Sequence, residues 1–384
     1  MEYVRLKDIG RIITGNTPPT SKPEYYGDYM PFIKATDISL GAKCTLVTEQ
    51  MYSELAAEKY KESLVPKGST CVVTIGSIGK KMTYAHTNLF VNQAINAIIP
   101  KNSYDKEYVY YTIRYSVLPQ LKKLDSGTTS GRENVSKSSF SGIRIPVIKD
   151  KSVQHRIASI LSAYDSLIEN NTKRIRLLEK MAENLYKEWF VRFRFPGYEK
   201  AEMENGLPKG WKIKRYEDEL NVKYGKGLPT DRLTDKGYPV FGSNGQIGYY
   251  TSYMYEQPQI LISCRGASSG VVNISLPMSF VTNNSLVCEI GDKTESVFEY
   301  LKYYFLNTNL VQYQTGSAQP QITINNIVKL KMLVPLKEVQ NKFAAKVMVF
   351  DKEMQNLAKQ NTLLARQRDL LLPRLMSGKL EVKP

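Results

Sequence analysis

An internal repeat constrains the fold of this chain more than any other feature, because a duplicated sequence predicts a duplicated architecture. Gly76 matches Gly266, and residues 91–95 match residues 281–285 at the same offset. The period of about 190 residues is far longer than the unit of a solenoid protein. The sequence therefore predicts two copies of one domain, each followed by a further segment.

The repeat continues beyond the first domain into a segment with a helical pattern. The matching positions are Gly127 with Gly316, Pro146 with Pro335, Gln154 with Gln340, Asp165 with Asp351 and Leu178 with Leu364. The predicted order is domain, long helix, domain, long helix. The expected boundaries are residues 1–150 for the first domain, 151–195 for the first helix, 196–336 for the second domain and 337–384 for the second helix and tail.

Each domain has the pattern of short strands separated by clusters of Gly, Asn, Ser and Pro. Strands are expected at residues 70–75, 94–99, 259–263 and 285–290, and short helices at residues 53–60, 106–115 and 296–306. The expected fold class is α+β, with two similar mixed, β-rich domains separated by two long helices.

Two long segments have apolar residues at alternating spacings of three and four, which is typical of helices. Residues 152–192 contain no Gly or Pro and stop before Pro196, and residues 338–372 are expected to end near Pro373. A helix of forty residues is roughly 60 Å long, too long to lie on one small domain. The alternative is that each helix merely covers its own domain.

The apolar positions of the two helices form matching heptad seams, which predicts a coiled coil. The first seam is Leu161, Tyr164, Ile168, Asn171, Ile175, Leu178, Ala182 and Leu185, and the second is Val347, Phe350, Met354, Leu357, Asn361, Leu364, Arg368 and Leu371.

Each seam contains one asparagine, at the fourth layer in the first helix and the fifth in the second. If the helices pair antiparallel and symmetrically, Asn171 faces Asn361, so neither amide is buried against an aliphatic side chain. The sequence therefore predicts an intramolecular antiparallel coiled coil. The eight layers would span roughly 36 Å, which is about one turn of B-DNA.

Composition narrows the class of protein. A formal net charge of +16 favours a partner rich in phosphate. The sequence has neither the pattern of a signal peptide nor that of a membrane span, so we expect a cytoplasmic protein. The four cysteines, Cys44, Cys71, Cys264 and Cys288, are too widely spaced for a zinc site, and the chain has only 2 His residues. We interpret the cysteines as buried strand residues and expect no metal site.

Three stretches closely resemble signature segments of type I restriction-modification specificity subunits. They are LLPRLMSGKL at residues 371–380, WFVRFRFPG at 189–197 and LPKGWK at 207–212. The resemblance covers the whole chain. It implies two target recognition domains that each read half of a split DNA sequence, in a protein of phage defence.

The resemblance also implies partners and cofactors. Two methylation subunits would bind S-adenosylmethionine and methylate adenine, and restriction subunits would use ATP and Mg²⁺. The chain itself would be a non-catalytic subunit without a cofactor. In agreement, residues 76–81 are too short for a phosphate-binding loop, and Asn16 with Pro18 and Pro19 only superficially resembles an adenine methyltransferase motif.

Direct reading of bases needs amides, hydroxyls and cations on well-supported loops. Two loops that recur in both domains fit: residues 75–81 with 264–270, and residues 127–134 with 316–321. Weaker candidates lie at residues 34–37, 92–93 and 283–284. The expected DNA-binding residues are Lys34, Thr36, Ser77, Lys80, Lys81, Arg132, Asn134, Arg265, Ser268, Asn283, Asn284, Ser317, Gln319 and Gln321. The competing interpretation is that these are ordinary solvated turns.

Other interpretations of the chain remain at this point. It could be the reading part of a fused restriction-methylation enzyme, or a coiled-coil scaffold with RNA-binding modules. The outer faces of the helices carry many cations, which could meet methylation subunits, DNA phosphates or only water. These residues are Lys173, Arg174, Arg176, Lys180, Lys359, Arg366 and Lys379.

Overall fold

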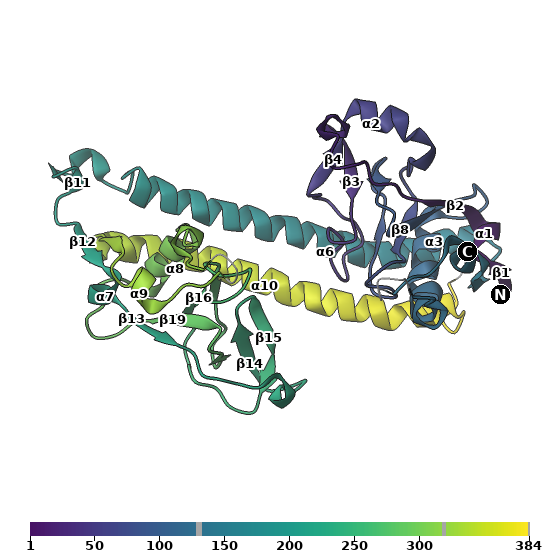
Figure 1. Cartoon of the computed structure of the whole chain (residues 1–384). Coiled ribbons are helices and arrows are strands. Elements are labelled where there is room, and N and C mark those ends of the chain that lie inside the picture. The colour runs from purple at the N-terminus through teal and green to yellow at the C-terminus, as the bar shows by residue number, and fades with distance from the viewer. Residues whose placement is uncertain (128–132, 317–319, 383–384) are drawn as a thin grey trace. The chain divides into compact units, whose positions relative to one another are not determined.

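The structure is a computed structural model that describes residues 1–127, 133–316 and 320–382 (Figure 1). The chain forms two compact units, one of Met1–Lys173 with Leu357–Pro384 and one of Arg174–Asn356. Each unit holds one β-rich domain and part of both long helices, α6 (Lys151–Tyr186) and α10 (Lys337–Met376). The division into compact units therefore crosses both helices, whereas the expected domain boundaries lie at their ends.

The first unit contains a four-stranded antiparallel sheet in the order β2-β8-β5-β6, a three-stranded sheet in the order β4-β3-β7, and the pair β1-β9. Its strands are β1 (Glu2–Arg5), β2 (Gly10–Thr14), β3 (Tyr26–Ile33), β4 (Gln50–Tyr52), β5 (Thr70–Val73), β6 (Met82–Tyr84), β7 (Phe90–Val91), β8 (Ile95–Pro100) and β9 (Arg144–Val147). Its short helices are α1 (Leu6–Ile9), α2 (Glu54–Lys59), α3 (Lys106–Thr112), α4 (Leu118–Leu121) and α5 (Lys137–Gly142).

The second unit repeats this plan with sheets in the orders β13-β19-β16-β17 and β15-β14-β18 and with the pairs β12-β20 and β10-β11. Its strands are β10 (Met203–Glu204), β11 (Leu207–Pro208), β12 (Lys212–Arg215), β13 (Asn221–Tyr224), β14 (Tyr238–Gly242), β15 (Gly245–Tyr250), β16 (Ile260–Ser263), β17 (Val272–Ile274), β18 (Phe280–Val281), β19 (Ser285–Glu289) and β20 (Lys331–Val334). Its short helices are α7 (Tyr216–Glu219), α8 (Phe298–Leu306) and α9 (Ile324–Ile327). The predicted α+β class with two similar domains is confirmed.

Local sequence explains where the short helices begin. The Ser53 hydroxyl accepts a hydrogen bond from the amide of Ala56 and starts α2, and the Asp105 carboxylate accepts one from Tyr108 and starts α3. The helix expected over residues 106–115 changes after Thr112 into a π-helical turn, Ile113–Val117. The expected and observed elements therefore differ mainly at their ends, where helices and strands commonly fray.

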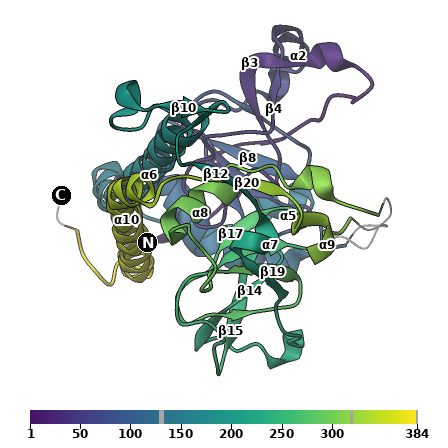
Figure 2. The ribbon, with the colours of Figure 1, turned by 90° about the vertical axis from the view of Figure 1, so that its left-hand side faces the viewer.

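In each unit the parts of α6 and α10 that belong to it lie side by side and run antiparallel (Figures 1 and 2). In the first unit Asp165 pairs with Arg368 and Asn171 with Gln360; in the second, Arg174 contacts Glu353 at 2.7 Å. All seam residues are buried or half-buried, whereas Leu177 off the seam is 64% exposed.

The seam asparagines do not hydrogen-bond to each other as predicted. The Asn171 amide donates to Gln360 Oε1 at 3.3 Å, and the Asn361 amide donates to Thr172 Oγ1 at 3.4 Å. Each asparagine thus bonds to the neighbour of the other, because Gln360 and Thr172 place an acceptor oxygen within hydrogen-bonding distance of its amide. The antiparallel direction holds, but the direct amide pair is replaced by a crossed pair.

The second helix does not end at Pro373 as expected but continues to Met376. Leu372, Leu375 and Met376 are buried in the core of the first unit beside α1 and α6. A proline in the last turn removes only one helical hydrogen bond. Burial of these side chains therefore keeps the final turn helical.

The first helix differs from its expected end as well. After Tyr186 it becomes a π-helical turn, Lys187–Val191. Trp189 and Phe190 of this turn are buried in the aromatic core of the second unit, beside Trp211 and Phe343.

Among the described residues, no helix is long and apolar enough to cross a membrane.

A paired carboxylate, buried in the first unit and half-buried in the second, marks the junction of domain and helix in each unit. In the first, Asp165 accepts a hydrogen bond from the Tyr111 hydroxyl at 2.6 Å and pairs with Arg368, which is 1% exposed. In the second, Asp351 accepts one from Tyr303 at 2.9 Å and pairs with Lys302 at 2.6 Å. The cation comes from α10 in the first unit and from α8 in the second.

Candidate nucleic-acid interface

The two loops that recur in the sequence lie against each other in the first domain. The amide of Gly76 donates to the carbonyl of Glu133 at 2.9 Å, and the amide of Val135 donates to Thr74 at 2.8 Å. Ile75 also forms an isolated β-bridge with Asn134. The first loop begins directly after β5, so the edge of the central sheet supports both loops.

The second domain joins its two loops with the same hydrogen bonds. The amide of Gly266 donates to Pro320 at 3.1 Å, and the amide of Ile322 donates to Cys264 at 3.0 Å. Arg265 forms an isolated β-bridge with Gln321. The shared backbone plan with different side chains provides two related surfaces of different chemistry.

Glycines allow the turns that both loop pairs require. Gly76 and Gly266 have φ of 85° and 76°, and Gly127 and Gly316 have φ of 65° and 87°. These values lie in the left-handed region, which side chains disfavour. A Cβ on Gly76, Gly127 or Gly266 would meet no atom within 4 Å, so the conformation and not crowding requires glycine there.

A carboxylate holds the second loop of the first domain in place. Asp125 Oδ1 accepts hydrogen bonds from the amides of Asn134 at 2.7 Å and Gly127 at 2.9 Å. These bonds, that of Asn134 first, lower the pKa of Asp125. The carboxylate therefore closes this loop while it is ionised.

The structure also joins the turn at residues 34–37 to the first loop. Lys81 Nζ donates to the carbonyl of Ala35 at 2.9 Å, and Lys34 Nζ pairs with Glu49 at 2.5 Å. Asp37 accepts a bond from the Lys34 amide at 2.7 Å and so caps the turn. Lys34 and Lys81 therefore stabilise the loops, while the neighbouring Lys80 is exposed.

The predicted DNA-binding residues differ in accessibility. Exposed ones are Thr36, Ser77, Lys80, Arg265, Asn284 and Gln321, and half-buried ones are Lys34, Lys81, Asn134, Ser268 and Asn283. Arg132, Ser317 and Gln319 lie outside the described residues. The backbone of Asn134 and Gln321 is used in loop pairing, so only their side chains are available to a ligand.

The structure adds residues to the surface that the repeat register did not indicate. The carbonyl of Lys226 accepts a bond from the Asn283 amide at 3.1 Å, and the amide of Asn16 donates to Val91 at 3.0 Å. Asn16 follows Gly15, which lies against the backbone at the end of β7. Lys226 follows Gly225, which lies against the backbone at the end of β18. These pairs do not follow the offset of the main repeat, so self-comparison missed them.

The described residues include no group of three or more His, Cys, Asp or Glu that could hold a metal ion. Cys71 and Cys288 are buried strand residues as expected, whereas Cys264 is buried but follows the end of β16, and Cys44 is half-buried and lies outside the strands. Burial raises the pKa of the Cys71 and Cys288 thiols to about 12. These thiols are protonated and inert at neutral pH.

Comparisons with known proteins agree on one family. The family described as the type I restriction modification DNA specificity domain matches residues 1–180 and 208–365. The chain is 28% identical to the type I restriction enzyme MjaIX specificity subunit of Methanocaldococcus jannaschii, over 99% of this chain and 93% of that protein.

A second relative is the type I restriction enzyme EcoprrI specificity subunit of Escherichia coli, 24% identical over 91% of this chain and 88% of that protein. The fold is similar to the crystal structure of a type I restriction-modification S subunit from M. genitalium. The TM-score is 0.57 at 18% identity, over 97% of this chain and 95% of that one.

Proposed function

Because the chain belongs to the family of type I restriction-modification DNA specificity proteins, we propose that its two domains each read one half of a bipartite DNA sequence. The chain is the specificity subunit of such a system and is a non-catalytic DNA-recognition subunit. The two-part reading is supported most by the duplicated loop pair, in which one backbone plan carries two different sets of side chains.

The pairing of the loops suits the reading of bases. Each loop pair is fixed by backbone hydrogen bonds, so its exposed side chains can be presented without the entropic cost of ordering a free loop. Lys80 in the first domain and Arg265 in the second are exposed cations in these loops. Such cations contribute to the net charge of +16, which attracts the phosphates of DNA.

The long helices are proposed to set the gap between the half-sites. Their seams span roughly 36 Å, which is about one turn of B-DNA. The chain would recruit two methylation subunits, which bind S-adenosylmethionine, and through them restriction subunits, which use ATP and Mg²⁺. We expect the methylation and restriction subunits to act on DNA in the cytoplasm.

Replacing Arg265 by Ala tests the assignment of the second loop pair. If Arg265 contacts a base, affinity for the native site should fall by about 5- to 150-fold, the range for one specific contact. The Arg265→Ala protein should also lose its preference among sites altered in the second half only. Lys236→Ala, an exposed cation away from the loops, is the control. Equal weakening on all DNA sequences would show a phosphate contact instead.

A further inference from the structure

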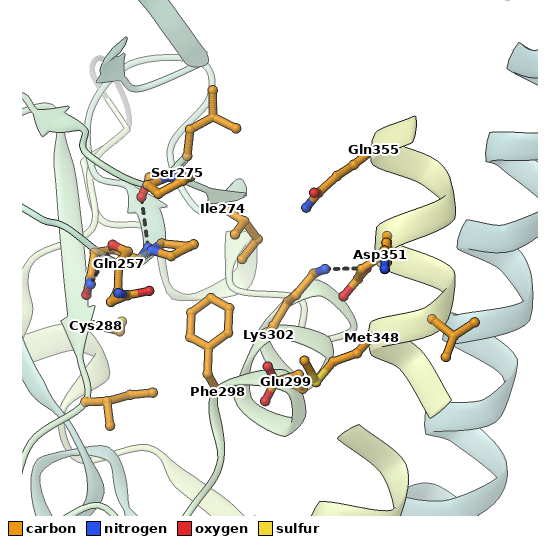
Figure 3. A pocket seen from close by; sticks show the side chains of 17 residues that line it. Gln257, Ile274, Ser275, Cys288, Phe298, Glu299, Lys302, Met348, Asp351 and Gln355 are labelled. Atoms are coloured by element: carbon orange, nitrogen blue, oxygen red, sulfur yellow. Dashed lines mark hydrogen bonds and ion pairs between the residues drawn. The ribbon is translucent and has the colours of Figure 1, made fainter. Parts of the chain in front are cut away.

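The second unit contains an open groove between its domain and α10 (Figure 3). Its volume is 990 Å³, and Ile274, Phe298 and Met348 line it. The Lys302–Asp351 ion pair lies at one side, as Figure 3 shows. Met348 and Val349 on α10 are 55% and 65% exposed. Apolar side chains so exposed along one groove are typical of a binding surface.

The corresponding groove of the first unit is filled by the chain itself. Lys43 Nζ pairs with Glu107 at 2.6 Å and lies 5.0 Å from the centroid of the Tyr84 ring. The amide of Tyr84 donates to the carbonyl of Lys43 at 2.8 Å, and Thr45 is buried. Residues 43–45 therefore lie along the outer edge of β6, where the amide of Thr45 also donates to the Thr83 hydroxyl at 2.9 Å.

The match between the two grooves follows from their hydrogen bonds. Tyr111 bonds to Asp165 as Tyr303 bonds to Asp351, so α3 corresponds to α8. In this register Tyr110 corresponds to Lys302, and β6 corresponds to β17 as the last strand of the four-stranded sheet. Among the described residues β17 pairs only with β16, so its outer edge has no strand beside it.

A difference in connection length explains why only one groove is filled. In the first unit, β3 ends at Ile33 and β4 begins at Gln50, and the intervening loop supplies residues 43–45. In the second unit, β14 is followed by only Ser243 and Asn244 before β15 begins. The second domain lacks the segment that would cover its own groove.

The lining indicates the chemistry of the missing occupant. In the first unit the ammonium of Lys43 lies 6.0 Å from the Tyr110 ring and 5.6 Å from the Tyr111 ring. In the second unit Lys302 stands at the position of Tyr110 and already neutralises Asp351. The groove thus favours an extended segment with apolar side chains and no cation at the position of Lys43.

We propose that this groove binds an extended apolar segment of a methylation subunit, which lies along the edge of β17 as residues 43–45 lie along that of β6. The inference rests on the proposed function, because it takes the partner from there. The two units would then cover equivalent grooves by different means. In the first unit the chain covers it, and in the second the partner does.

The test uses the full chain and the methylation subunit encoded with it. Val349→Glu and Leu276→Glu place a charge on exposed groove positions, so folding should be unaffected. Each should weaken binding at least about tenfold. Ala163→Glu is the matched control, because Ala163 is the exposed residue of α6 that corresponds to Val349. In the wild-type complex the amide of Ile274 should gain protection from hydrogen exchange.

A photo-crosslinking residue at position 349 identifies the occupant. An adduct with the methylation subunit supports the proposal, and an adduct with a second copy of this chain overturns it. Unchanged affinity of both groove variants, in a complex that forms normally, overturns the groove assignment alone. Failure of the wild-type chain to bind the methylation subunit would instead overturn the proposed function together with this inference.

Discussion

At the scale of single residues, the buried charges carry more consequence than the exposed cations. The side chains of Arg368 and Asp165 are each 2% exposed, so their charges are shielded from water and depend on each other. The heptad pattern placed Arg368 in the seam but did not indicate its partner, because Asp165 lies off the seam on the other helix. Only packing brings the two together.

Replacement of Arg368 by Met should destabilise the protein strongly. The carboxylate of Asp165 would remain buried with only the Tyr111 hydroxyl as a partner, and loss of one member of such a pair costs about 3–5 kcal/mol. Urea unfolding measures the effect, with the exposed Arg366→Met as control. Adding Asp165→Asn to Arg368→Met should recover part of the loss. Equal stability of the Arg366 and Arg368 variants would contradict this account.

Gly225→Ala should distort the segment that lies against the backbone at the end of β18. A Cβ at position 225 would collide with the backbone carbonyl oxygens of Val281 and Thr282, which cannot move independently of the sheet. We expect a loss of about 1–3 kcal/mol in thermal unfolding. Gly227→Ala, where a Cβ meets no atom within 4 Å, is the matched control. If both variants unfold at the same temperature, Gly225 does not lie as close to Val281 and Thr282 as the structure indicates.

At the scale of elements, the repeat predicted both loops of each surface, and the structure shows that they pair. The heptad seams and most strands also follow from periodicity, because burial of one face imposes it. The antiparallel direction was predicted instead from the layers at which Asn171 and Asn361 lie. The crossed bonds of Asn171 and Asn361 do not follow from periodicity, because they depend on the side chains of Gln360 and Thr172 beside the seam. The unfilled groove beside β17 was missed because it reflects an absent loop.

The contacts of Asp125 with the amides of Gly127 and Asn134 should loosen in acid. The pKa of Asp125 is lowered in the folded state, so its stabilising effect is full above the pKa of an unfolded Asp, near 3.8, and is lost as pH falls through the folded value. An NMR titration of the Gly127 and Asn134 amides should show this midpoint. In Asp125→Asn the transition should disappear. A midpoint at or above the ordinary value would refute the contribution of these hydrogen bonds.

At the scale of the whole molecule, one chain carries two loop pairs built on one plan, and each compact unit combines a domain with parts of both long helices. A domain can therefore change its loops without changing the buried contacts, at Gln154 or Gln340, that attach it to its helix. This separation of reading from assembly is what a modular specificity subunit requires.

The central claim is that each domain reads its own half of the DNA target. The most direct measurement is methylome sequencing of cells in which residues 196–336 are exchanged for the matching domain of the Escherichia coli relative. We predict a split methylated sequence in which one half changes while the other half and the gap stay the same. A change in both halves, or an unsplit sequence, would contradict the account.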